Sequence, residues 1–296
     1  MNKNYNDTCG GSEHTYLNTG AKDQCLEAVT VLLILAKDSF RFDSITDFKS
    51  KVKWDEAIKS RDLVPLFELY ELANANTEET YYESRNFKKR TGKAMKVVTA
   101  EAYLSLCSDA ALRSYANTEY NRLFEITEDG DIIGVFDTDG IKIKGQKIKD
   151  FTVGIRENAT TAKPATTSIT ITYSDYMELV DSSIISQPSF DPVLDLYGIF
   201  NANFLVLPSP APAATGFKFT VNVGCKSEKY MTEITSLKFN DTSGADQNAT
   251  FTFDSATGIY TAAGTSLVTG ELTTDGVQQD AVTGDSYEGK TDVIIP

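Results

Sequence analysis

The chain has 296 residues, of which 41% are hydrophobic, and its 42 acidic and 28 basic residues give a formal net charge of -14. A chain of this length and composition can bury a substantial core and divides into one to three domains. The excess of negative charge repels phosphate and argues against sequence-specific binding of nucleic acid, although DNA could slide past a smooth acidic surface.

The amino-terminal segment, residues 1–22, is polar and contains several glycines, which predicts a flexible arm. It lacks the apolar stretch of a secretory signal, and the longest apolar run, Val31–Ala36, is far shorter than the roughly 20 residues that span a bilayer. We therefore expect a soluble protein without membrane contact. The dispersed cysteines are expected to be reduced thiols: Cys9, Cys25, Cys107 and Cys225.

Helical patterns dominate the next part of the chain. From Asp23, apolar residues recur at helical spacing and predict a buried helix, or a helix that runs into a strand. Ser44 and Asp47 form a weak capping box, and a helix to about Lys59 is expected after it. Its apolar face would be Ile45, Phe48, Val52 and Ile58. Trp54 is interpreted as the anchor of this helix in the core.

β-branched and aromatic residues take over after Leu72. The predicted strands are Tyr120–Ile126, Ile132–Phe136, Ile141–Ile148, Phe151–Ile155 and Ser168–Tyr173. A helix over Tyr103–Tyr115 interrupts them, because apolar residues recur there at intervals of three and four: Leu104, Cys107, Ala111 and Tyr115. The fold class is therefore α+β, mainly β, with antiparallel strands.

Alternating prolines in residues 208–216 favour an extended backbone that cannot join a central strand, which predicts a linker there. The linker would separate a first domain, residues 23–207, from a second, residues 217–296. The second segment is rich in Thr, Gly and Asp and contains alternating runs such as Phe217–Val223 and Thr250–Phe253. It predicts a small immunoglobulin-like β-sandwich.

Residues that carry chemistry are scarce. The only histidine, His14, lies in the predicted arm, which argues against Ser-His or Cys-His catalysis and against a zinc site. Four nearby carboxylates do not match the spacing of an EF-hand loop: Asp129, Asp131, Asp137 and Asp139. Asp-Gly pairs between apolar runs more simply predict hairpin turns. We expect no catalytic residue, cofactor or metal.

Charges are segregated in blocks between residues 78 and 93. An acidic, tyrosine-rich stretch precedes a short basic run, which is either a solvated loop or part of a subunit interface with aromatic anchors. The candidate interface residues are Glu79, Tyr81, Tyr82, Glu83, Phe87, Lys88, Lys89, Arg90 and Lys93, together with Asp129 and Asp131 of the first Asp-Gly turn.

The order and spacing of several short motifs between Glu78 and Asp191 resemble a family of virion proteins from crAss-like and other phages of gut Bacteroidetes. These motifs are Thr80–Ser84, Thr91–Lys93, Ala110–Ser114, Glu128–Gly134, Asp139–Gly140, Lys144–Gly145 and Phe151–Val153. The family forms rings of the portal-to-tail assembly and resembles phage tail-tube proteins in fold.

The resemblance implies a tail-tube-like antiparallel β-sandwich or barrel with flanking helices. Identical copies would close into a ring, with twelve-fold symmetry as in a phage portal, around the DNA channel between portal and distal tail. The implied partners are identical copies and adjacent ring, portal or tail proteins, with DNA only as passing cargo. The implied location is the virion neck or tail, after synthesis in the cytoplasm of the bacterial host.

Two other functions stay open at the level of sequence. The Thr-rich carboxy-terminal segment is compatible with a carbohydrate- or receptor-binding adhesion module. A glycosidase that acts through two carboxylates is the least favoured reading, because no suitable pair can be identified from spacing.

Overall fold

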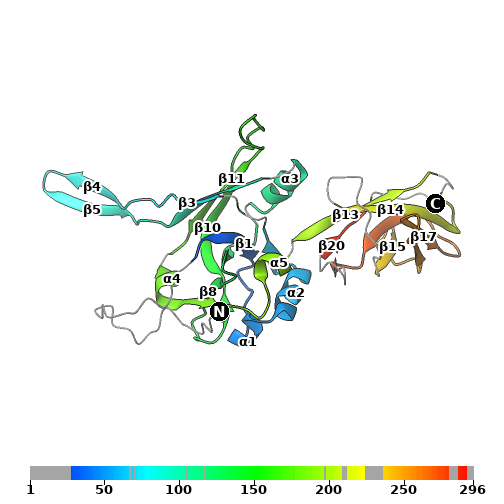
Figure 1. Cartoon of the computed structure of the whole chain (residues 1–296), viewed down its shortest axis with the longest axis horizontal. Coiled ribbons are helices and arrows are strands. Elements are labelled where there is room, and N and C mark those ends of the chain that lie inside the picture. Colours follow the sequence, from blue (N-terminus) through cyan, green and yellow to red (C-terminus); the bar gives the residue numbers. More distant parts are fainter. Residues whose placement is uncertain are drawn as a thin grey trace. The chain divides into compact units, whose positions relative to one another are not determined.

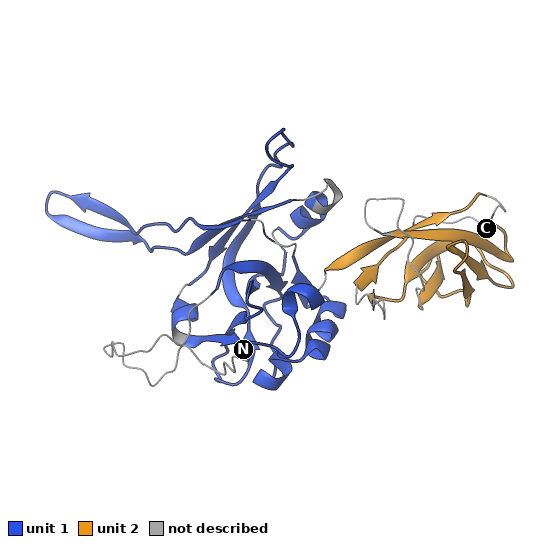
Figure 2. Ribbon diagram, in the orientation of Figure 1, with its two compact units in different colours: residues 1–196 blue, residues 197–296 orange. Residues whose placement is uncertain are grey.

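The computed structural model describes residues 28–66, 69, 71–103, 106–116, 118–175, 177–196, 198–208, 212–223, 236–279 and 286–291. The chain divides into two compact units, residues 1–196 and 197–296 (Figure 2). The predicted arm, with Cys9 and His14, lies outside the described residues. The fold is α+β and mainly β, with antiparallel pairing in almost every sheet contact, as predicted.

Unit 1 is built on one large antiparallel sheet with strand order β12-β8-β7-β10-β11-β6-β3 (Figure 1). β1 also pairs with β7, β2 with β1, and β9 with β8, whereas β4 and β5 pair only with each other. The strands are β1 (Thr30–Ala36), β2 (Leu63–Pro65), β3 (Glu71–Asn74), β4 (Thr80–Ser84), β5 (Phe87–Gly92), β6 (Val97–Ala102), β7 (Arg122–Thr127), β8 (Ile132–Phe136), β9 (Ile143–Lys144), β10 (Gln146–Val153), β11 (Thr167–Tyr173) and β12 (Ser183–Ser186). The helices are α1 (Ile45–Phe48), α2 (Lys51–Lys59), α3 (Leu106–Ser114), α4 (Met177–Ser182) and α5 (Pro192–Asp195).

Strand β7 is the centre of unit 1, because it pairs with β1, β8 and β10 and every one of its residues is buried. Side chains alternate between the two faces of a strand, so both faces of β7 must be covered. On one face Leu123 belongs to the core that also contains Leu112 of α3. On the other face Phe124 packs against Trp54 of α2, with ring centroids 5.3 Å apart.

The first described segment bears on the prediction of a buried helix or a helix that runs into a strand: its described part is a strand, and residues 23–27 lie outside the described residues. Residues Thr30–Ala36 form strand β1, which pairs along β7 and β2. All residues from Leu32 to Ala36 are at least 95% buried, because both faces of this strand are covered. A continuous apolar run fits a buried strand as well as a buried helix, so the spacing alone could not distinguish the two alternatives.

The predicted helix to Lys59 is present but divided. The Ser44 hydroxyl accepts a hydrogen bond from the Asp47 N–H, which confirms the cap, and α1 and α2 are separated at residues 49–50. Trp54 is fully buried as predicted, and its Nε1 donates to the Phe48 carbonyl at 2.7 Å. Val52 was wrongly assigned to the apolar face, since it is 62% exposed.

Two further boundaries differ from the prediction. The expected strand Ile141–Ile148 is interrupted at Gly145, where a Cβ atom would lie 2.8 Å from the Leu123 backbone, so only glycine can approach β7 this closely. Strand β10 then continues through the predicted gap to Val153. Helix α3 confirms the predicted helix, but Ala111 is exposed and Leu112 is buried.

Unit 2 has two β layers. A sheet with order β16-β17-β14-β13-β20-β19 packs against the pair β15 and β18 through a common core that includes Phe219, Phe239 and Leu272. Its strands are β13 (Ile199–Val206), β14 (Gly216–Val223), β15 (Leu237–Asp241), β16 (Thr250–Asp254), β17 (Ile259–Ala263), β18 (Gly270–Thr274), β19 (Gln278–Gln279) and β20 (Ser286–Glu288). The alternating runs at Phe217 and Thr250 are strands, as predicted.

The predicted linker at residues 208–216 does not separate the units. The boundary lies between Leu196 and Tyr197, so β13 belongs to unit 2 and not to the predicted first domain. The proline-rich segment connects β13 to β14, which pair antiparallel. Proline cannot join a central strand, so a proline-rich segment is suited to the connection between two paired strands as well as to a linker between domains.

Replacing Trp54 with alanine should lower the free energy of unfolding by about 3–5 kcal/mol, because it opens a cavity in the aromatic cluster beside β7. Val52→Ala on the same helix is the matched control and should cost less than about 1 kcal/mol, since Val52 is 62% exposed. Urea unfolding followed by circular dichroism measures both changes. Equal costs for the two variants would contradict this packing.

Candidate assembly interface

Strands β4 and β5 form a two-stranded hairpin that projects from the sheet edge made by β3 and β6 (Figure 1). Its turn contains only Arg85 and Asn86, a loop length typical of hairpins. A bridge between Thr77 and Met95 connects it to the sheet. All hairpin residues are exposed except Gly92, which is half-buried. The hairpin therefore contributes almost nothing to the core of its own unit.

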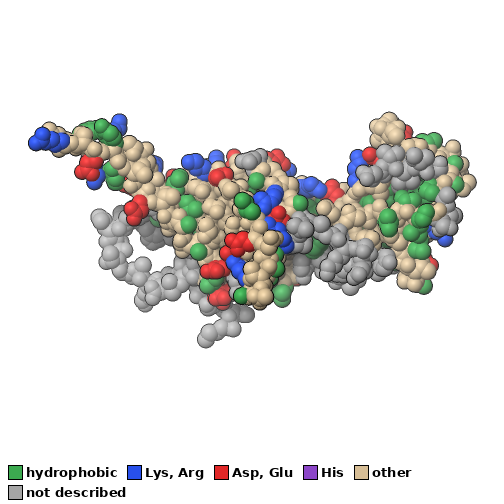
Figure 3. All heavy atoms as spheres, turned by 90° about the horizontal axis from the view of Figure 1, so that it is seen from above, with side chains coloured by type: hydrophobic (Ala, Val, Ile, Leu, Met, Phe, Trp, Pro, Cys, Tyr) green, Lys and Arg blue, Asp and Glu red, His purple; other side chains and the backbone are tan. Residues whose placement is uncertain are grey.

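Three aromatic side chains lie on this hairpin. Tyr81 is 48% exposed, Tyr82 is 62% exposed and Phe87 is 55% exposed. An isolated two-stranded hairpin is marginally stable in water, and exposed apolar groups gathered in one place mark interaction surfaces. Figure 3 shows basic side chains at the tip of the hairpin, with acidic and hydrophobic ones behind them. These features make the hairpin the leading candidate for a binding surface.

One face of the hairpin is internally neutralised; we call it the ion-paired face, and it consists of Glu79, Tyr81, Glu83, Lys88 and Arg90. Arg90 Nη1 donates to Glu79 Oε1 at 2.9 Å, and the Tyr81 hydroxyl donates to the same carboxylate. Lys88 Nζ lies 3.8 Å from Glu83 Oε2 and 4.8 Å from the centre of the Tyr81 ring. The Tyr81 hydroxyl, followed by the Arg90 guanidinium, lowers the pKa of Glu79 below its usual value.

The opposite face carries Tyr82, Ser84, Phe87 and Lys89; we call it the aromatic–lysine face. Register places Tyr82 opposite Lys89 and Ser84 opposite Phe87, so these four side chains share one side of the ribbon. Within the described parts of the chain, the Lys89 ammonium has no hydrogen bond or ion pair. This face thus offers apolar area beside one uncompensated positive charge.

The predicted interface residues fall into two places. Glu79 to Arg90 lie on or beside the hairpin, and Lys93 follows β5. Asp129 and Asp131 lie in the turn between β7 and β8, on the body of unit 1, and are not brought to the hairpin. The Asp-Gly pairs do form hairpin turns as predicted, since Gly130 and Gly140 have φ angles of 81° and 68°.

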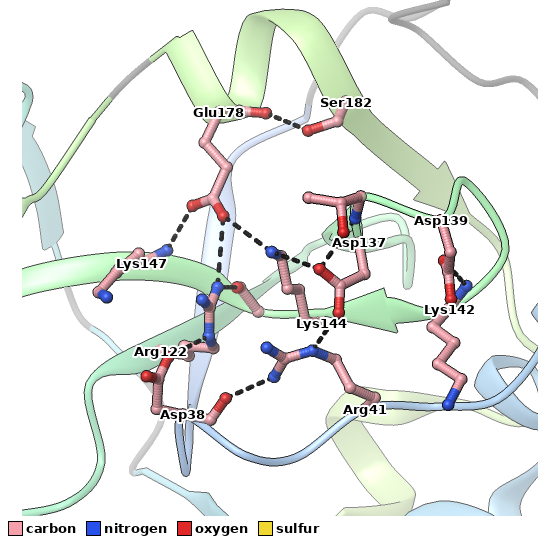
Figure 4. Close-up of polar contacts among 12 residues, drawn as sticks. Asp38, Arg41, Arg122, Asp137, Asp139, Lys142, Lys144, Lys147, Glu178 and Ser182 are labelled. Carbon is pink, nitrogen blue, oxygen red and sulfur yellow. Dashed lines mark hydrogen bonds and ion pairs between the residues drawn. The ribbon is translucent and has the colours of Figure 1, made fainter.

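A buried polar network joins helix α4 to the sheet, and the sequence did not reveal it (Figure 4). Arg122 is 5% exposed and Lys144 is 8% exposed. Arg122 Nε donates to Asp38 at 2.7 Å and its Nη1 to Glu178 at 3.3 Å. Glu178 also accepts a hydrogen bond from the Lys147 backbone N–H at 2.8 Å.

Asp137 completes this network. It accepts hydrogen bonds from Arg41 at 2.7 Å and from Lys144 at 2.9 Å. The Arg41 guanidinium, followed by the Lys144 ammonium, holds the pKa of Asp137 far below its usual range. One signal in the sequence indicates this contact: the basic residue Lys144 follows Asp137 by seven positions, across a predicted turn. This spacing places opposite charges on neighbouring strands.

The described residues contain no group of three or more His, Cys, Asp and Glu side chains that could hold a metal ion. Among the same residues, no helix is long and apolar enough to cross a lipid bilayer. A scan against protein-family models finds no match to the chain, and a search of curated proteins finds none.

Asp137→Asn should lower the free energy of unfolding by about 1–3 kcal/mol at pH 7, because it weakens two charge-assisted hydrogen bonds. The folded-state pKa of Asp137 is depressed, so its contribution is complete above the ordinary value of 3.8 and is lost as the pH falls below it. The difference in stability between the two proteins should therefore be constant from pH 7 to about 5 and shrink between about pH 4 and 2.

Urea unfolding across this pH range measures the effect. Asp43→Asn serves as the control, because the Asp43 side chain is 80% exposed at 3.5 Å from Lys142 and should contribute less than about 1 kcal/mol. A stability difference for Asp137→Asn that grows as the pH falls would contradict the assigned role.

Proposed function

We propose that this chain is a non-enzymatic structural protein of a phage virion. It acts as a ring subunit that self-associates around the DNA channel of the neck or tail, between the portal and the distal tail. The observation that carries the proposal is the projecting hairpin Thr80–Gly92, whose aromatic–lysine face is exposed and has no partner among the described residues of its own unit.

A surface of this kind suits assembly better than catalysis. Aromatic side chains near the centre of an interface supply most of its binding energy, and charged groups determine register and partner choice. A head-to-tail contact joins two different surfaces and closes into a ring when its rotation divides a full turn. The resemblance of residues 78–191 to ring proteins of the portal-to-tail assembly supports a ring, for which twelve copies would match a portal.

The net charge of -14 fits the proposed contact with DNA. A channel wall that repels phosphate lets the genome pass without adhering, so DNA would be cargo and not a ligand. The proposed protein partners are identical copies and the adjacent ring, portal or tail proteins. The proposed location is the virion.

Removal of the hairpin tests this function. Residues 78–94 can be replaced by Asn-Gly, because Thr77 and Met95 already face each other as a bridge. We expect the full chain to form a closed oligomer in native mass spectrometry and electron microscopy, and the shortened chain to be monomeric. Its circular dichroism should still show a folded β protein, since the hairpin lies outside the core.

The matched control shortens a different exposed loop. Residues 158–165, between the bridged Glu157 and Thr166, can be replaced in the same way. This loop has no aromatic residue, and its Lys163 is already paired with Glu101 at 2.6 Å, so we expect assembly to persist. A full chain that stays monomeric at all concentrations, alone and with purified neck and tail proteins, would contradict the proposal.

A further inference from the structure

A second surface of unit 1 has the apolar and acidic character that matches the hairpin's exposed aromatic and basic side chains. It is a groove of about 600 Å³ between the β7–β8 turn and the segment that leads from β12 into α5. We call it the acidic groove. Its lining residues are Val31, Glu128, Asp129, Gly130 and the consecutive residues 187–194.

The groove combines apolar walls with an acidic rim. Val31, Phe190 and Val193 are half-buried in its lining, and Leu194 is 64% exposed. Glu128 and Asp129 are exposed, and within the described residues neither side chain has a hydrogen bond or an ion pair. An apolar trough bordered by uncompensated negative charge fits a ligand that presents apolar area beside a positive charge.

The walls of the groove are held in place before any partner binds. The hydroxyl and the N–H of Ser189 both donate to the Lys49 carbonyl, at 3.0 and 3.3 Å, and fasten the segment to the end of α1. The Asp191 carboxylate accepts hydrogen bonds from the N–H groups of Val193 and Leu194 and fixes the start of α5. A preformed site loses less conformational entropy on binding.

The aromatic–lysine face has the properties that this groove requires. Tyr82 and Phe87 supply apolar area, since an aromatic side chain buries about 150–250 Å² in a contact. Lys89 lies opposite Tyr82 and two positions from Phe87, and within the described residues its ammonium has no partner. It therefore offers a positive charge that suits the acidic rim. The ion-paired face is a poorer match, because its charges already neutralise one another.

A hairpin cannot dock into the groove of its own chain. The hairpin extends from β3 and β6 at one end of the strand order (Figure 1). The residues that line the groove flank β8 and β12 at the other end. The large sheet separates them. Contact must therefore join two copies, and because the two surfaces differ, the contact is head-to-tail.

We infer that the aromatic–lysine face of one copy docks into the acidic groove of a second copy, with Lys89 paired to the Glu128–Asp129 rim. This inference rests on the proposed function and specifies the contact through which the ring would close. Each subunit then uses its hairpin toward one neighbour and its groove toward the other.

Charge reversal on both sides of the contact tests the pairing in the full-length chain. Lys89→Glu and Asp129→Lys should each weaken self-association at least tenfold, because each places like charges together, and the double variant should recover most of the loss. Lys88→Glu, on the ion-paired face, is the matched control and should change association less than about threefold, as expected of a charge outside the contact. Analytical ultracentrifugation gives the dissociation constants.

A mixing experiment tests the head-to-tail geometry. The variant Tyr82→Ser/Phe87→Ser lacks a competent hairpin, and Leu194→Glu lacks a competent groove. Each should be monomeric alone, and an equimolar mixture should give heterodimers only, because one intact hairpin and one intact groove remain. Circular dichroism checks folding, and all three substitutions lie at exposed positions.

The outcomes separate this inference from the proposed function. If the native chain forms rings that Lys89→Glu and Asp129→Lys leave intact, this contact is wrong and the ring proposal stands. If the native chain stays monomeric, both are wrong. Binding of duplex DNA or of another virion protein that Lys89→Glu abolishes, with self-association unchanged, would also overturn the docking of a second copy.

Discussion

The hairpin Thr80–Gly92 is too thin to bury its own side chains. Two paired strands have no third layer, so Tyr81, Tyr82 and Phe87 face water on a ribbon that leaves the sheet. Burying an aromatic side chain is worth about 1.5–3 kcal/mol, and the described residues of unit 1 do not supply that stabilisation to the hairpin. The ion pairs of the hairpin neutralise the charges of one face, and the aromatic–lysine face stays exposed.

The body of unit 1 provides the fixed base that such a ribbon needs. Strand β7 is covered on both faces, and Arg122 at its start connects α4 to the sheet through Glu178. The same strand ends in the turn that supplies Asp129 to the acidic groove. The groove and the root of the hairpin therefore belong to one hydrogen-bonded sheet, so a contact at either site is held by the same frame.

Much of the fold could be read from local pattern. The β-branched and aromatic residues of β8 indicate a strand, and apolar residues at intervals of three and four indicate helix α3. The Asp-Gly pairs indicate turns, and Trp54 is buried as its large aromatic side chain suggests. The sequence left β1 open between a buried helix and a strand that follows a helix, because a strand covered on both faces has no polar alternation. The groove could not be predicted, since it joins residues 128–130 to residues 187–194 through tertiary contacts alone. The hairpin residues could be found from the sequence, because acidic and basic residues are grouped in separate stretches there. Their division into two faces could not, because it depends on which residues of β4 and β5 lie opposite each other.

Hydrogen exchange along the hairpin tests the central claim most directly. The full-length chain would be measured at concentrations below and above its self-association, with peptides covering residues 80–92 followed by mass spectrometry. The account predicts fast exchange at low concentration and strong protection on assembly, accompanied by protection of residues 187–194. An assembled particle in which the hairpin exchanges as fast as in the monomer would contradict it.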